Sequence, residues 1–284
     1  MEVGVNFKNL ASYNENMAKG MEDKLFFIKK LNLQPNKNYL FVDFGCADGV
    51  LIDTLYGIMK DNNINAFFIG YDISETMIEL AKNKFSHYPT YNVLFTSKWD
   101  DVKKSIDTYS EMESVLILSS VIHEVYSYAD SLDDIDLFWH RVLDSNFKYI
   151  CIRDMMCSRD INRKTKRNLW VKLDEECPLG STLRSQVNEF EKIWGSTHEL
   201  NKQFIHFLLK YRWTINWKRE VNENYFPIDI EGFLEKMESY NLIYFKRFRV
   251  PYLEKCWYDD FRIKLEDYTH IKAIFENKKN NDDI

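Results

Sequence analysis

Two acidic residues and a glycine-containing turn form the pattern with the clearest chemical meaning. Asp43 stands near the end of an apolar run, residues 39–44, and Gly45 and Gly49 lie in the turn that follows. Glycine permits a tight turn and lets a ligand approach the backbone, and a helix after such a turn offers unpaired amides. Asp72 ends the next apolar run, where a carboxylate can accept both hydroxyls of a ribose. The combination predicts a site for a nucleotide-like ligand.

The order Asp43, Gly45, Ala47, Gly49 resembles the first motif of class I S-adenosylmethionine-dependent methyltransferases. That motif has an acid followed by glycines at alternate positions, and alanine replaces the middle glycine here. The resemblance implies a Rossmann-like sheet of seven strands and S-adenosylmethionine as the cofactor. The cofactor-binding residues that it implies are Asp43, Gly45, Cys46, Ala47, Gly49, Asp72, Ile73, Trp99, Asp100 and Ser119.

The resemblance also implies a role for several of these residues. Asp43 and Gly45 are expected near the amino-acid part of the cofactor, and Asp72 on the ribose hydroxyls. Ile73 is expected to pack on the adenine, and Asp100, in the loop after the third strand, to contact its edge. A dinucleotide fits less well, because the spacing G-x-G-x-x-G is absent and an acid at position 43 repels a diphosphate but suits an ammonium group.

The polar stretch after the fourth apolar run, residues 118–128, is expected to border the reacting methyl group, because ligands of open α/β sheets bind beyond the carboxyl ends of the strands. His123 can take a proton from an oxygen or nitrogen acceptor, or it can brace the loop. Glu124 can orient that imidazole or bind a cationic acceptor. Tyr126 is a candidate for the acceptor pocket, and we expect no metal site.

Arg153 and Asp154 end the fifth apolar run at the same rim. Arg153 can fix an anionic acceptor, or the two residues can form a salt bridge that shapes the site, which is the interpretation we favour for an arginine beside an acid.

A basic cluster follows a few residues later. It crowds five cations and one acid, Asp160, into residues 159–167, and its cations are Arg159, Arg163, Lys164, Lys166 and Arg167. Such a cluster can hold the phosphates of an RNA, although it is more often a solvated helix face. The chain as a whole carries a formal charge of −6, which disfavours broad polyanion binding.

Apolar runs alternate with helical patterns over residues 1–156, which predicts parallel strands joined by crossover helices. A helix over residues 14–31 precedes the first strand. Residues 157–222 have helical spacing without a convincing strand and are predicted to form an inserted cap. Residues 223–284 are expected to complete the sheet.

The elements expected in that last segment end in an antiparallel hairpin. They are a helix over 230–237, a strand over 242–250, its antiparallel neighbour over 256–263 and a frayed tail over 276–283.

Composition sets the broad class. The chain has 284 residues, of which 45% are hydrophobic and 29% charged, which is typical of a compact globular protein. Its five cysteines are widely spread without a C-x-x-C pair, so free thiols are expected. The N-terminus lacks the pattern of a secretion signal, and no run reaches the roughly 18 apolar residues of a membrane span. We therefore expect a cytoplasmic protein with no membrane attachment, and the sequence gives no oligomeric state.

These observations together predict a methyltransferase that acts on an oxygen or nitrogen of a small molecule bound under the helical cap. An RNA methyltransferase that uses the basic cluster remains an alternative. A second alternative is a non-catalytic partner protein that keeps the same fold, because fold alone does not fix activity.

Overall fold

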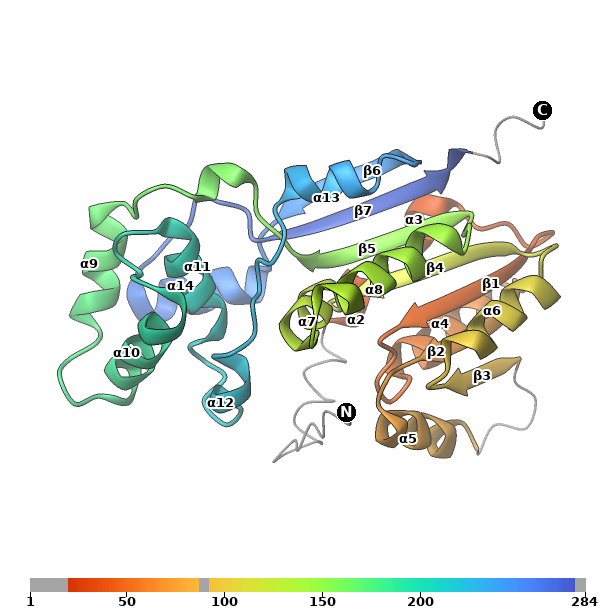
Figure 1. The fold of residues 1–284 in the computed structure, drawn as a ribbon, viewed down its shortest axis with the longest axis horizontal. Helices are drawn as coiled ribbons and strands as arrows, with labels where there is room; N and C mark the ends of the chain where they lie inside the picture. The colour runs from red at the N-terminus through yellow and green to blue at the C-terminus, as the bar shows by residue number, and fades with distance from the viewer. Residues whose placement is uncertain (1–19, 87–91, 279–284) are drawn as a thin grey trace.

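A seven-stranded mixed sheet forms the centre of the molecule in the computed structural model, which describes residues 20–86 and 92–278 (Figure 1). Its order is β3-β2-β1-β4-β5-β7-β6, and β7 is antiparallel to both of its neighbours. The other neighbouring pairs are parallel. The strands are β1 Asn38–Phe44, β2 Asn65–Tyr71, β3 Val93–Thr96, β4 Glu113–Ser119, β5 Tyr149–Met155, β6 Tyr240–Phe248 and β7 His270–Asn277. The predicted fold class is confirmed: this is the strand order of the class I methyltransferase fold.

Helices cover both faces of this sheet, which explains the continuous apolar runs of its central strands. In β1, six of the seven residues are buried. Alternate strand residues point to opposite faces, so Leu40 and Val42 join one hydrophobic cluster while Tyr39 and Phe41 join another. The first cluster contains residues of α6 Trp99–Thr108, α8 Leu132–Asp144 and α13 Ile230–Lys236, and the second contains residues of α4 Val50–Asp61 and α5 Glu75–Phe85.

The segment before the first strand consists of two short helices, α2 Met21–Lys24 and α3 Ile28–Leu31, rather than one. Leu25 and Phe27 are both buried. Residues two apart lie on different sides of a helix, so a continuous helix would expose one of them. The predicted single helix over 14–31 is therefore wrong for residues 20–31, and its part before residue 20 lies outside the described residues.

A helical region lies beyond the carboxyl end of β5 (Figure 1). Its elements within residues 157–222 are η1 Arg159–Ile161, α9 Arg167–Glu175, α10 Thr182–Trp194, α11 Asn201–Lys210 and α12 Trp217–Glu220. This segment is helical, as its apolar spacing predicts. Phe190, Phe204 and Phe207 are fully buried in its core.

The helix α14, Pro251–Phe261, contributes to the same core, although it lies after α13 in the chain. Trp257 is buried there, and its indole Nε1 donates to the carbonyl oxygen of Leu208 (2.8 Å). The predicted strand over 256–263 is therefore wrong. Pro251 at the first helical position and Cys256, Trp257 and Phe261 on one face are helix signals that outweigh the aromatic content.

The antiparallel neighbour of β6 is β7, which also pairs with β5. Glu276 and Asn277, predicted to be in a frayed tail, belong to this strand, and Asn277 is buried. Residues 279–283 of that predicted tail lie outside the described residues. Among residues 20–86 and 92–278, no helix has the length and apolarity needed to cross a membrane.

Candidate functional site

The turn after β1 adopts a left-handed backbone at three alternate positions. The φ angles are +78° at Gly45, +47° at Ala47 and +79° at Gly49. A Cβ atom on Gly45 would lie 2.8 Å from Cγ2 of Val121, and one on Gly49 would lie 2.9 Å from the ring of Phe95. Glycine is required at both positions because of the φ angle and the close neighbour. The alanine at position 47 keeps the left-handed turn in spite of its side chain.

Asp72 binds this turn directly. One carboxylate oxygen accepts a hydrogen bond from the amide of Ala47 (2.9 Å), and the other accepts one from the amide of Ser74 (2.9 Å). Burial raises the pKa of Asp72, and these two amides oppose the shift. The carboxylate therefore lies between the turn and the first residues of α5, at the carboxyl edge of β2. Ile73, the next residue, is 82% exposed at this edge.

Asp43 lies one strand away from Asp72 and is buried. Burial raises its pKa to about 7, the positive charge of Lys24 lowers it, and the negative charge of Asp72 raises it further. The structure thus brings the two predicted acids together, with Lys24 of α2 as a neighbouring cation. The side chain of Cys46 is also buried, so its thiol is enclosed in the core below the turn.

The residues predicted to contact the adenine are arranged differently from expectation. Trp99 and Asp100 begin α6 and do not lie in a loop. Trp99 is buried against Phe44 and Tyr71, with ring centroids 5.5 and 5.2 Å away, whereas Asp100 is exposed. Trp99 thus packs in the core of the sheet, and the adenine contact of Asp100 stays a prediction.

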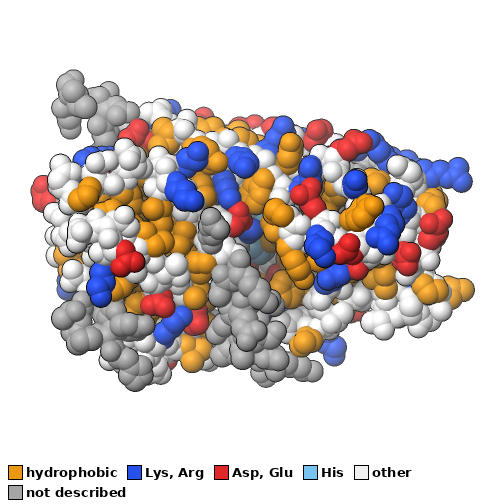
Figure 2. Space-filling view, turned by 180° about the vertical axis from the view of Figure 1, so that it is seen from behind, with side chains coloured by type: hydrophobic (Ala, Val, Ile, Leu, Met, Phe, Trp, Pro, Cys, Tyr) orange, Lys and Arg blue, Asp and Glu red, His pale blue; other side chains and the backbone are white. Residues whose placement is uncertain are grey.

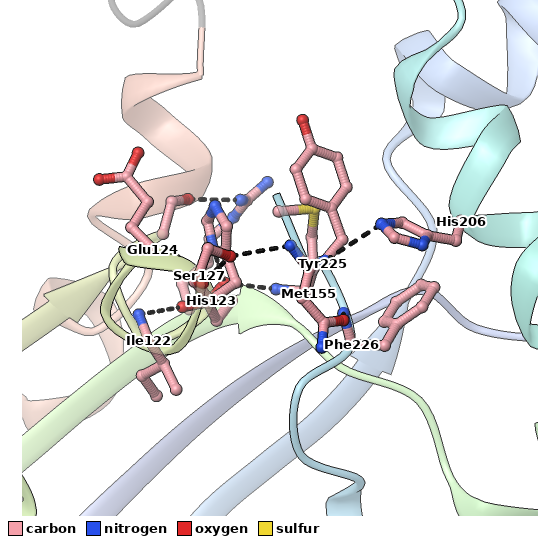
Figure 3. A network of polar contacts seen from close by, with 12 residues as sticks. Ile122, His123, Glu124, Ser127, Met155, His206, Tyr225 and Phe226 are labelled. Carbon is pink, nitrogen blue, oxygen red and sulfur yellow. Dashed lines mark hydrogen bonds and ion pairs between the residues drawn. The ribbon is translucent and has the colours of Figure 1, made fainter. Parts of the chain in front are cut away.

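His123 is paired with a buried aspartate. It lies in α7, Ile122–Tyr128, and its Nδ1 is 2.7 Å from Oδ1 of Asp154, which is completely buried at the end of β5. Asp154 also accepts hydrogen bonds from the amides of Ile122 (2.8 Å) and Met155 (2.7 Å), so its carboxylate is fixed in place (Figure 3). An imidazole whose Nδ1–H is held by a carboxylate keeps Nε2 as a proton acceptor.

The charges around His123 favour its protonated form. Burial lowers the pKa of the imidazole, but the charge and hydrogen bond of Asp154 raise it more, and Glu124 and Glu223 add to that increase, so the pKa is above its ordinary value. The ring of Tyr225 packs edge-on against the imidazole, with 5.4 Å between centroids. His123 is only 5% exposed, so its neighbours enclose it on nearly all sides.

Glu124 has a partner other than His123. One of its oxygens accepts a hydrogen bond from Nη2 of Arg219 in α12 (3.1 Å), and Arg219 also pairs with Glu223 (2.9 Å). Asp154, not Glu124, orients the imidazole. The hydroxyl of Tyr126 accepts a hydrogen bond from Nε1 of Trp139 (2.9 Å), which directs that side chain toward α8.

Arg153 and Asp154 do not form the predicted salt bridge, because neighbouring strand residues point to opposite faces of a sheet. Arg153 pairs instead with Asp23 of α2 (3.0 Å), and its Nη1 donates to the hydroxyl of Ser120 (2.9 Å). Ser119 lies opposite Arg153 in the register of β4 and β5. Its hydroxyl oxygen is buried and has no hydrogen-bond partner within the described part of the chain.

The basic cluster is largely neutralised by acids from other elements. Arg159 pairs with Asp229 (2.9 Å), Arg163 with Asp267 (2.8 Å), Lys164 with Glu199 (3.2 Å) and Lys166 with Glu266 (2.6 Å). Figure 2 shows Lys and Arg side chains interspersed with Asp and Glu over the helical region, on the right of that view. This surface lacks the uniform positive charge that binds a phosphate backbone.

Sequence reasoning missed four candidate functional residues. They are Asp154, which pairs with His123; Lys24, which is the cation beside Asp43; Asp23, which pairs with Arg153; and Arg219, which pairs with Glu124. Each acts on a residue far away in the chain, so no local spacing points to it. The available signal was that Arg153 and Asp154, two charged residues, end the fifth apolar run. It suggested Arg153 as the partner of Asp154, which is wrong.

Comparison with known proteins gives similarity in structure only. No protein-family model matches the chain, and no curated protein matches it in sequence. Similar solved structures include BH2331 from Bacillus halodurans, with 11% identity and a TM-score of 0.43 over 90% of this chain and 98% of that one. PKMT2 from Rickettsia typhi has 14% identity and a TM-score of 0.44 over 86% and 49%. LepI in complex with SAM has 10% identity and a TM-score of 0.41 over 86% and 44%.

The chain thus spans about half the length of PKMT2 and less than half that of LepI. At these identities the similarity concerns the fold alone. The fold is that of the class I S-adenosylmethionine-dependent methyltransferases, as the order and direction of the seven strands establish.

Proposed function

We propose that this protein is an S-adenosylmethionine-dependent methyltransferase that methylates an oxygen or nitrogen of a small molecule. The observation that carries the proposal is the convergence of three features at the carboxyl edge of β1 and β2: the left-handed turn at Gly45–Gly49, the buried carboxylate of Asp43 and the carboxylate of Asp72 on that turn. Ligands of open α/β sheets bind at this edge.

The residues at this edge fit the cofactor in charge. A buried acid whose pKa is raised to about 7 is stabilised when a cation approaches it, and S-adenosylmethionine carries an ammonium and a sulfonium. The buried hydroxyl of Ser119 offers a hydrogen bond that no described residue takes up. Glycine at positions 45 and 49 permits the left-handed turn, whose backbone a ligand can approach, and we assign the carboxylate of Asp72 to the ribose.

When bound, S-adenosylmethionine supplies a methyl group on a good leaving group, so the chain must mainly position the acceptor. The residues for proton transfer are His123 and Asp154. A neutral His123 accepts the proton of an acceptor hydroxyl or amine at Nε2, while Asp154 holds Nδ1–H and stabilises the imidazolium that forms. Because the pKa of His123 is raised, we expect turnover to increase with pH through that raised pKa.

A small molecule is favoured over RNA as the acceptor because four of the five cations of the basic cluster are paired with acids. The helical region beside the site, joined to α7 through Arg219, is suited to cover a small acceptor and exclude water.

The test uses the full chain with methyl-labelled S-adenosylmethionine and a small-molecule cell extract that has been freed of macromolecules. We expect a labelled product with the wild-type protein, a much weaker one with His123→Gln, and binding of S-adenosylmethionine by calorimetry to both. Lack of cofactor binding by a folded protein would overturn the proposal and favour a non-catalytic partner protein. Label in added RNA but not in small molecules would favour an RNA methyltransferase.

A further inference from the structure

Three cationic side chains lie next to one another on the neighbouring strands β5, β7 and β6. Arg153 of β5 is opposite Lys272 of β7, and Lys272 is opposite Lys246 of β6. Like charges directly opposite each other destabilise a sheet. Lys246 is exposed, so water screens it, but the side chains of Arg153 and Lys272 are only 14% and 13% exposed. These two buried cations need an anion between them.

Asp23 supplies that anion from outside the sheet. Its Oδ2 is 3.0 Å from Nε of Arg153, and its Oδ1 pairs with Nζ of Lys272. The carboxylate is carried by α2, a helix of four residues, and its side chain is 31% exposed. Arg153 donates in addition to the hydroxyl of Ser120. A carboxylate thus occupies a partly open place lined by two cations and a hydroxyl group.

This place adjoins both parts of the proposed active site. Ser119 lies opposite Arg153 at the end of β4, and the amide of Ser120 donates to the carbonyl oxygen of Arg153 (2.8 Å). The next residue after Arg153 is Asp154, which holds His123. The side chains of Arg153 and Asp154 point to opposite faces of β5, but both residues stand at its carboxyl end. A molecule with its acidic group on Arg153 therefore lies at the same edge of the sheet as the base and the cofactor turn, and reaches the base across that edge.

Aromatic rings flank the two cations. The ring centroid of Phe248 is 5.8 Å from the guanidinium of Arg153 and 4.7 Å from Nζ of Lys272, and the ring of Phe26 is 5.5 Å from the same ammonium. Phe248 is buried and Phe26 is half-buried, so Phe26 is the ring that can offer an apolar surface to the body of a ligand while the cations bind its charged end. The arrangement suits an organic acid better than an inorganic anion.

We propose that Arg153, Lys272 and the Ser120 hydroxyl form a subsite for a carboxylate of the methyl acceptor, and that Asp23 occupies this subsite when no acceptor is bound. The role of the ligand as acceptor rests on the proposed function. Binding of a carboxylate at Arg153 and Lys272 does not, and it can be measured without any methyl transfer.

The experiment measures binding of 4-fluorobenzoate to the full chain by fluorine NMR, with 4-fluorobenzyl alcohol as the neutral probe of the same shape. Asp23→Asn removes the internal carboxylate and keeps both cations. Lys272→Gln removes one cation, and Lys246→Gln is the matched control on the next strand. Calorimetry with S-adenosylmethionine on the same samples reports on the proposed function separately.

We expect Asp23→Asn to lower the Kd for 4-fluorobenzoate about tenfold, because the internal carboxylate no longer holds the two cations. Lys272→Gln should raise the Kd about tenfold, because one charge-assisted hydrogen bond to the ligand is lost. Lys246→Gln should leave it within about twofold, and the alcohol should bind at least about tenfold more weakly than the acid. Equal binding of acid and alcohol, or equal Kd values for Lys272→Gln and Lys246→Gln, would overturn the subsite. These last comparisons remain decisive if Asp23→Asn does not fold.

Discussion

Buried polar groups have different surroundings in the helical region and at the carboxyl edge of the parallel strands. In the helical region, Lys210 is fully buried and donates to the carbonyl oxygens of Glu220 and Glu223, while its ammonium lies 4.2 Å from the ring centroid of Tyr225. At the sheet edge, the hydroxyl of Ser119 is buried without a partner among the described residues. Native proteins satisfy nearly all buried polar groups. The described residues hold two side-chain exceptions, Ser119 and Tyr240, and Ser119 is the one at the carboxyl end of a strand, where a ligand is expected.

The pKa shifts of the two regions fit the same distinction. Burial lowers the pKa of Lys210 to about 7, although Glu223 and Glu220 raise it, and the ammonium is enclosed by groups of its own region. Burial raises the pKa of Asp43 to about 7, and its neighbours are the cation of Lys24 and a second acid, Asp72. Lys210 is enclosed by acceptors of its own region, whereas Asp43 has a second acid beside it, so an incoming cation would favour its ionised form.

The two regions meet at α7, the helix that carries His123. On the sheet side, Asp154 binds the imidazole and the amide of Ile122. On the helical side, Tyr225 packs on the imidazole ring, and the amide of Asn224 donates to Ser127 (2.8 Å) in the network of Figure 3. The proposed base is therefore positioned by both regions, so substitutions in the sheet and substitutions in the helical region should have different effects.

The largest effect is expected for Asp154→Asn. Loss of the carboxylate removes the group that orients His123 and stabilises its charged form, so kcat should fall about 10²–10⁴-fold, the usual contribution of a general base. Binding of S-adenosylmethionine should remain within about twofold. Steady-state kinetics with the labelled acceptor and calorimetry provide the two measurements. Asp144→Asn is the control, because its pair with His140 is exposed; a loss below tenfold for Asp154→Asn would contradict the role of the dyad.

Phe207→Ala should destabilise the helical region strongly. The ring is fully buried against Phe190, Tyr211 and Trp217, and removal of a buried phenylalanine costs about 3–5 kcal/mol. Urea unfolding monitored by tryptophan fluorescence measures the loss. Leu179→Ala is the control, since Leu179 is 95% exposed. If the free energy of unfolding changed by less than 1 kcal/mol, the helical region would not have the packed core described above.

Asp72→Ala should weaken binding of S-adenosylmethionine about a hundredfold, because hydrogen bonds to a charged group contribute about 1.5–3 kcal/mol each. The variant also loses the acceptors of the Ala47 and Ser74 amides, so its thermal unfolding must be compared with that of the wild type. Glu75→Ala changes an exposed neighbouring acid and serves as control. Equal affinity of Asp72→Ala and wild type by calorimetry would remove Asp72 from the cofactor site.

The smallest effect is a dependence of cofactor binding on pH. With a pKa of about 7, Asp43 is mostly neutral at pH 6 and mostly ionised at pH 7.5, and the ionised form attracts the cationic cofactor. The Kd for S-adenosylmethionine should therefore fall about eightfold over this interval. The corresponding stability effect has the opposite sign: the contribution of Asp43 is present below about pH 4 and lost as the pH rises through 7. Asp43→Asn should abolish the dependence of Kd, and its persistence would assign it to another group.

Much of the sheet was predictable because buried parallel strands leave a local signature. The run before Asp43 and the run before Asp72 are strands, and both acids meet at the turn they were expected to flank. The strand β7 was missed, and residues 256–263 were mistaken for it. Aromatic and β-branched residues suit both strands and buried helices, and the helical spacing around Trp257 should have decided between them.

The candidate site was predictable only in part. Gly45 and Gly49 were recognisable because glycine is the residue type that readily adopts the left-handed backbone found at both positions. The partner of His123, by contrast, lies 31 residues away on β5, and its identity depends on which face of β5 each side chain occupies. The direction of a side chain follows from strand register, which composition does not determine. For the same reason, the pairing of Arg153 with Asp23 across 130 residues had no local signal.

The order in which the strands enter the sheet has a consequence for synthesis on the ribosome. β7 follows every other described strand in the chain, yet it lies between β5 and β6. Until residues 270–277 have emerged, β5 has an open hydrogen-bonding edge and β6 has no partner. A nascent chain with such an edge can pair with other chains. We therefore expect the growing polypeptide to depend on chaperones until residues 270–277 have been translated.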